Sequence, residues 1–244
     1  MTALELLRAN EGRQFRDEDG NGETFTLLPP LSADELKSLA DGLPCALPVS
    51  MRELLSVTRG WTGGPLESVD LSGLNGGFGM EEIFPHALSI AHDGYGNYWV
   101  VDLLSTSTKW GPIYYACHDP PVIVYQCADI DQFVRDVLTM IEPPFKGPID
   151  EVHEGAVDRV WKENPGVFPV SQAIASTDPE LNAFGRSLPS EAFVADLRRA
   201  RLGDGFSWGR FGPRTPLFRH GESPVFAYAS LPAKNRFITW LTGR

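Results

Sequence analysis

The fold is decided by residues 90–103, which read Ile90-Ala91-His92-Asp93-Gly94-Tyr95-Gly96-Asn97-Tyr98-Trp99-Val100-Val101-Asp102-Leu103. Two apolar runs flank residues 94–97, whose glycines and asparagine tolerate the positive φ of a tight turn. Along the second run alternate side chains share a face, which puts Asp102 on the face of Tyr98 and opposite Trp99. The segment therefore predicts two strands joined by a turn, in a sheet with one buried face and one wetter face.

Short runs of aromatic and β-branched residues continue on both sides of this segment, between Trp61 and Tyr125. Glycine and proline interrupt them at short intervals, which is typical of strands joined by turns. The predicted strands are 67–71, 80–84, 87–91, 98–103, 113–116 and 122–125. Helix start and stop signals predict helices from Ser32 to Gly42, after Pro48, and from Asp129 to Pro143.

Composition and charge both change between Pro143 and Pro148, which predicts a domain boundary there. The chain is thereby divided into a first domain, residues 1–145, and a C-terminal extension of unknown type, residues 146–244. Within the extension we predict helices around 152–161, from Pro179 onward and over 190–200, followed by a strand at 225–230. The extension is therefore expected to be a smaller α+β appendage.

The negative charge of the chain is concentrated in the first domain. Residues 1–145 hold 21 acidic residues and 8 lysines and arginines, a net charge of -13, whereas residues 146–244 carry +2 and the whole chain -11. Charge of this sign opposes general nucleic-acid binding and permits a basic partner, although solubility alone also explains it. Arginines and aromatic residues mix between Arg198 and Arg219, a pattern that fits either base stacking or packing against the acidic domain.

Metal, cofactor and membrane sites are not indicated. The sequence has no Cys-x-x-Cys, His-Glu-x-x-His or EF-hand spacing, no Gly-x-Ser-x-Gly, and no apolar run of about 18 residues. Neighbours such as Cys117 and His118 point to opposite faces of an extended chain, so they do not clamp an ion. Three cysteines and an acidic start at residues 1–8 favour a cytoplasmic protein. Because the motifs above are missing from the sequence, we expect no cofactor and no metal.

Residues 90–103 resemble the central motif of the Smi1/Knr4 (SUKH) family, and so does their setting. Leu47-Pro48 opens the preceding helix, 111–115 precede His118-Asp119, and 128–133 begin the closing helix. The resemblance covers roughly residues 27–142. Two departures are Asn97, where the family often has Asp, and residues 60–64, a loose match to its Asn-Gly-Gly.

The resemblance implies an α+β fold with a mixed or antiparallel sheet flanked by helices. Bacterial members look like immunity proteins that bind and neutralise polymorphic toxins, and fungal relatives are regulatory scaffold proteins linked to cell-wall synthesis. Neither role is enzymatic, so no catalytic residue is transferred. We expect an intracellular protein-binding module of the immunity type, with the regulatory role as the alternative.

A partner surface is predicted on one sheet face and its rim, at Trp61, Asp93, Tyr95, Asn97, Tyr98 and Asp102. An acidic surface there would mimic nucleic acid and steer a basic toxin domain toward the protein. Structural roles compete with this interpretation: Asp93 and Asn97 could stabilise their own turn, Trp61 and Tyr98 could be core, and Asp102 could cap the next loop. A third hypothesis is an unrecognised hydrolase or small-ligand enzyme that uses His92, His118 or Cys117.

Overall fold

The computed structural model describes residues 1–66, 68–74 and 78–230. The helical segments are α1 (Ala3–Asn10), α2 (Ala33–Gly42), α3 (Val49–Leu55), α4 (Ile130–Leu138), α5 (Pro148–Asp150), the π-helix η1 (Glu151–Ala156), α6 (Val157–Glu163), α7 (Val170–Ile174) and α8 (Pro179–Ser187). The strands are β1 (Gln14–Arg16), β2 (Gly22–Thr24), β3 (Thr26–Leu27), β4 (Gly60–Thr62), β5 (Ser68–Asp70), β6 (Leu88–His92), β7 (Tyr98–Val101), β8 (Ile113–His118), β9 (Pro121–Cys127), β10 (Val167–Pro169), β11 (Ala192–Asp196), β12 (Gly205–Phe206), β13 (Leu217–Arg219) and β14 (Val225–Ala229).

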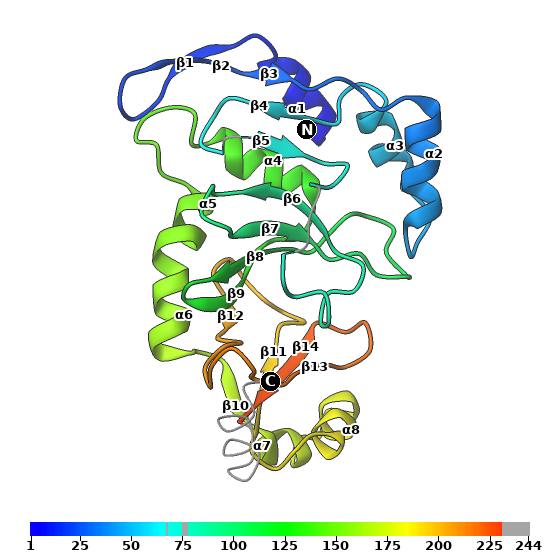
Figure 1. The fold of residues 1–244 in the computed structure, drawn as a ribbon, viewed down its shortest axis with the longest axis vertical. Helices are drawn as coiled ribbons and strands as arrows, with labels where there is room; N and C mark the ends of the chain where they lie inside the picture. The colour runs from blue at the N-terminus through cyan, green and yellow to red at the C-terminus, as the bar shows by residue number, and fades with distance from the viewer. Residues whose placement is uncertain (67, 75–77, 231–244) are drawn as a thin grey trace, which may run out of the picture.

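The centre of the molecule is an antiparallel sheet in the order β12-β9-β8-β7-β6-β5-β4-β3 (Figure 1). The predicted hairpin forms its middle, with His92 opposite Tyr98 at the turn. The α+β class, with an antiparallel sheet flanked by helices, is confirmed. Of the strand predictions, 80–84 is wrong, because the amides of Ile83 and Phe84 bond back to the Met80 carbonyl in a helical turn. Residue 67, the predicted start of β5, lies outside the described residues.

Both faces of the large sheet are covered at β7–β9, which corrects the expectation of a wetter face there. Trp99 and Val101 point into a core shared with α1, α3, α4 and the segment η1–α6. Val100 and Tyr114, on the opposite face, pack with Phe226 and other residues of the extension. The period-two alternation of β7 was therefore predicted correctly, but the chain covers the second face with its own C-terminal part.

That covering layer is a second antiparallel sheet, β10-β11-β14-β13, which Figure 1 shows below the large one. Its alternation sends Phe226 toward the large sheet and Val225 toward α7 and α8. The predicted helix at 190–200 is wrong: 192–196 is the strand β11, paired on both sides. A short apolar run does not reveal its period, and pairing with β10 and β14 decides the outcome.

Residues 1–145 and the extension contribute strands to the same sheet and side chains to the same hydrophobic cores. Strand β12 of the extension pairs with β9 and becomes the edge of the large sheet. The segment α5–η1–α6 lies beside this sheet and leads from it to the smaller one (Figure 1). The division into domains at residue 145 stays a prediction. Packing against the acidic first part accounts for some of the arginines between Arg198 and Arg219.

Helix signals in the sequence were read correctly where a local cap sets the boundary. Ser32 and Glu35 form the predicted capping box of α2, and Asp129 caps α4. Asp178 caps α8 and Pro179 occupies its first turn. Among the described residues no helix is long and apolar enough to cross a membrane.

Candidate functional site

The turn between β6 and β7 is held by the carboxylate of Asp93. Its Oδ1 accepts hydrogen bonds from the backbone amides of Tyr95 (2.8 Å) and Asn97 (3.2 Å), and its Oδ2 accepts one from the Asn97 side chain (2.6 Å). Asn97 in turn accepts a bond from the amide of His118 on β8 through Oδ1 (2.9 Å). The turn-stabilising roles considered for Asp93 and Asn97 are thus the ones their contacts show.

The same carboxylate also faces inward. Asp93 Oδ2 accepts a hydrogen bond from the Tyr115 hydroxyl at 2.8 Å and lies 3.3 Å from Nε2 of His153. Burial opposes ionisation, but the hydrogen bonds from Asn97, Tyr115 and two amides outweigh it and lower the pKa of Asp93 to about 2. Asp93 is therefore a fixed negative charge, and its side chain is only 6% exposed.

His153 belongs to the extension and lies on the π-helix η1. Its ring stacks on Trp99 (centroids 6.1 Å apart) and meets the edge of Tyr115 at 5.4 Å. Trp99 is in turn fixed by a hydrogen bond from Nε1 to Gln126 at 3.2 Å. π-Helical turns are rare, and those that proteins contain often lie at functional sites. Here the turn joins the extension to the central hairpin.

These residues line a cleft of about 680 Å³. Its walls are the β1–β2 hairpin loop, the turns after β4 and β6, the segment after α4, and α5–η1. Apolar and acidic side chains line it together: Phe15, Pro65, Leu66, Trp99, Met140, Ile141, Phe145 and Ile149 are apolar, and Asp17, Glu18, Asp19, Glu23, Asp93, Asp150 and Glu154 are acidic. One lysine, Lys146, is the only full cation in this lining.

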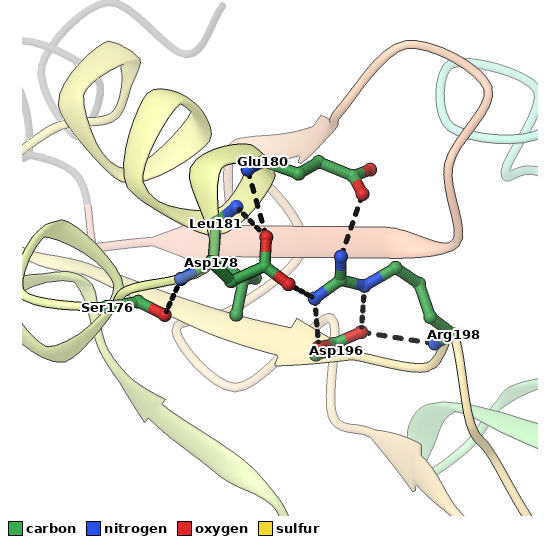
Figure 2. A network of polar contacts seen from close by, with 6 residues as sticks. All are labelled: Ser176, Asp178, Glu180, Leu181, Asp196 and Arg198. Atoms are coloured by element: carbon green, nitrogen blue, oxygen red, sulfur yellow. Dashed lines mark hydrogen bonds and ion pairs between the residues drawn. The ribbon is translucent and has the colours of Figure 1, made fainter.

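Most of these carboxylates are not neutralised by the chain itself. Within residues 1–66, 68–74 and 78–230, Asp93 is the one acidic residue of the cleft that has an ion pair, with His153. A fully paired group of acidic residues lies in the extension. Figure 2 shows the guanidinium of Arg198 held by Asp178, Glu180 and Asp196, with N–O distances of 2.7–2.8 Å. The cleft is thus a concentration of uncompensated negative charge.

The six residues of the predicted partner surface are not all on the surface. Tyr95 is 80% exposed at the turn and Tyr98 is half-buried, whereas Asn97 is buried beneath them. Trp61 is fully buried and stacks on Phe25 at 5.8 Å, so it is a core residue. In this structure the buried Trp61 and Asn97 cannot contact a partner. Partner binding by Tyr95 and Tyr98 stays a prediction.

Asp102 is buried in an ion pair and not at a loop cap. Both its oxygens accept hydrogen bonds from Arg219 of β13, at 3.0 and 2.7 Å. Arg219 also donates to the carbonyl of Ile83 and lies over the rings of Phe84 and Phe226. The extension therefore closes the sheet face on which Asp102 lies, and it leaves the cleft at the turn end of the hairpin open.

The candidate catalytic residues have local structural roles. Burial raises the pKa of the Cys117 thiol to about 11, which keeps it protonated and unreactive near neutral pH. His92 accepts the amide of Gly94 at Nδ1 (3.1 Å), and His118 contacts Asn97. Over the described part of the chain, no cluster of three or more His, Cys, Asp or Glu is arranged to hold a metal.

Sequence reasoning missed the extension's contribution to the cleft. His153, Asp150 and Glu154 lie beyond the predicted boundary, in a part of the chain whose net charge is slightly positive. Only the folded chain brings them opposite the acidic loop 17–23. The available signal was the acidic surplus of the first part, which did not indicate which carboxylates gather.

Comparison with known families confirms the resemblance. Residues 30–136 match the SMI1 / KNR4 family (SUKH-1), a stretch somewhat under half of the chain. The match includes the hairpin and the turn after β4, and it excludes the β1–β2 loop and α5–η1. Neither the curated proteins nor the solved structures include a significant match to this chain.

Proposed function

With SUKH-1 sequence at residues 30–136 as the premise, we propose that the chain is a non-enzymatic protein-binding module of the immunity type. Its partner is a basic bacterial toxin domain, which it binds and neutralises in the cytoplasm. SUKH domains are associated with protein–protein interactions, and the resemblance implies the toxin as the kind of partner. The observation that carries the proposal on this chain is the cleft with its unpaired carboxylates.

Uncompensated charge favours a protein partner of opposite sign. Carboxylates that face solvent without a counter-charge raise the rate at which a basic protein approaches, and salt screens this effect over about 10 Å at 0.1 M. The half-buried side chains of Phe15, Met140 and Phe145 in the cleft lining add apolar area that a partner can bury. A nucleic acid would be repelled by the same charges.

The cleft is also better suited to binding than to covalent catalysis. Asp93 and His153 form a dyad, but the lining contains no serine, threonine or cysteine that the histidine could activate. The three cysteines are free thiols, and burial raises the pKa of both Cys117 and Cys127. Free, protonated thiols are compatible with a reducing cytoplasm.

The proposal is tested by affinity capture with the full chain as bait, at low and at high salt. We expect one basic toxin domain to be retained at low salt, released by salt, and inhibited in its own activity by the purified chain. Capture of acidic or neutral proteins alone, without salt dependence, would contradict the proposal. If the chain instead captures a regulatory protein of its own cell and does not inhibit it, the regulatory role is favoured.

A further inference from the structure

We propose that the cleft receives a lysine- or arginine-bearing segment of the basic partner, and that the extension supplies the wall that recognises it. This inference rests on the proposed function and names the part of the chain that performs it. The SUKH-1 match ends at residue 136, so the wall formed by α5 and η1 is a feature of this chain beyond the matched region.

The lining combines apolar and acidic groups. Phe15, Met140 and Phe145 are half-buried in the cleft lining, while Glu18 and Glu154 are exposed. A lysine or arginine side chain has the matching distribution, because its methylene stem buries well while its charged head stays among polar groups. A small inorganic cation would gain nothing from the apolar lining.

The carboxylates of the cleft are spread along it. The acidic residues come from three separate segments: the loop at 17–23, the turn at Asp93, and Asp150 with Glu154. No three of the acidic, histidine or cysteine residues among those described converge as an ion site requires. Carboxylates spread along a cleft fit an extended segment with several basic side chains, and they do not fit a single ion.

The chain itself binds one of its guanidinium groups with carboxylates. Arg198 shows how carboxylates of this protein hold a guanidinium, through a bond to Glu180 at 2.8 Å and two bonds to Asp196 at 2.7 and 2.9 Å (Figure 2). Asp150 and Glu154 have no ion pair within the described residues, although they lie one helical turn apart on one short segment. They are available to a cation from outside.

The extension wall is fixed in place by the contacts of His153. His153 lies between Asp150 and Glu154 and is held by Asp93, Trp99 and Tyr115. The wall is thus anchored to the central hairpin and does not have to be ordered when the partner binds, which lowers the entropic cost of association. A π-helical turn at this position is a further sign of a functional segment.

The test measures binding of fluorescein-labelled hexa-arginine and hexa-lysine peptides to the full chain by fluorescence anisotropy. The variant Asp150→Lys/Glu154→Lys reverses the extension wall. Its matched control, Glu53→Lys/Glu191→Lys, makes the same change in total charge at exposed positions outside the cleft. A neutral pair, Asp150→Asn/Glu154→Gln, retains the side-chain volumes, and circular dichroism checks that each variant is folded.

We expect the reversed wall to weaken binding of both peptides by about tenfold or more, the neutral pair to lie between, and the control to stay within about twofold of the wild type. Equal losses in the wall variant and the control would overturn the inference, because total charge would then explain binding. Absence of binding by the wild type would overturn it as well. If affinity capture retains a basic toxin whose binding ignores Asp150 and Glu154, only this inference fails; if no protein partner is captured, the proposed function fails.

Discussion

Replacing Arg219 by methionine tests whether the extension is an integral part of the fold. The Arg219 side chain is 6% exposed and the Asp102 side chain 1% exposed, so the pair is almost completely removed from water. Arg219 makes two bonds to Asp102 and further bonds to the carbonyls of Ile83 (2.8 Å), Glu222 (2.8 Å) and Ser223 (3.1 Å). Methionine preserves much of the apolar stem and removes every one of these donors.

The size of the effect follows from the charge that remains. Breaking one partner of a buried ion pair costs about 3–5 kcal/mol, because the other charge stays buried without compensation. Burial already raises the pKa of Asp102, against the lowering effect of Arg219. Without Arg219 the pKa of Asp102 rises further, so Asp102 in the folded variant holds its proton to a higher pH than in the unfolded chain. The loss in free energy of unfolding should therefore be smaller at pH 5 than at pH 8.

The assay is urea unfolding followed by tryptophan fluorescence, which reports on the buried Trp61, Trp99 and Trp110. Wild type, Arg219→Met, Asp102→Asn and the double variant form a mutant cycle. We expect the double variant to be less destabilised than the sum of the single changes, since it leaves no uncompensated charge.

Two results would refute this reasoning. A loss below about 1 kcal/mol for Arg219→Met would mean that the pair is solvated or easily replaced. A separate early transition that leaves the tryptophans of the large sheet unaffected would mean that the extension unfolds on its own. One cooperative transition, shifted to lower urea, is the expected outcome.

Three further predictions concern the hairpin, the thiols and the sheet. The lowered pKa of Asp93 contributes about 2 kcal/mol to the free energy of unfolding above about pH 4, and this contribution is lost as the pH falls through about 2. The difference in unfolding free energy between wild type and Asp93→Asn should therefore shrink by about half at about pH 3. A difference that does not change with pH would contradict this prediction. Cys117 and Cys127 should resist iodoacetamide at neutral pH in the folded chain, as mass spectrometry of the native and the urea-unfolded protein will show; rapid native labelling would disprove their burial. Gly60→Ala places a Cβ 1.8 Å from the carbonyl oxygen of Val69 and should cost about 3 kcal/mol in urea unfolding, so a neutral effect would show that β4 and β5 do not pair as described.

The sequence predicted what local rules determine. The turn at Gly94 and Gly96, the alternation along β7, and the caps at Ser32, Asp129 and Asp178 each depend on residues a few positions apart. Such local patterns can be recognised without knowledge of the rest of the fold. The family resemblance depended on the same local pattern and was confirmed for this reason.

Long-range contacts were beyond the sequence. Strand β11 is determined by pairing with β10 and β14, and the apolar run from Ala192 to Leu197 does not distinguish a strand from a helix by itself. Asp102 was predicted on the partner surface, with a loop cap as the alternative, because its ion-pair partner, Arg219, lies 117 positions away. The cleft was missed for the same reason, since its acidic residues come from segments as far apart as Asp17 and Glu154.

The central claim is that a basic partner occupies the cleft, and site-specific photocrosslinking tests it most directly. A photoreactive amino acid is placed at position 154, in the cleft, and in a separate chain at the control position 191, which is exposed and outside it. Each chain is irradiated with the basic toxin domain captured at low salt. We predict a covalent adduct from position 154 that maps to a lysine- or arginine-bearing segment, and none from position 191. An adduct from position 191 alone would contradict the account.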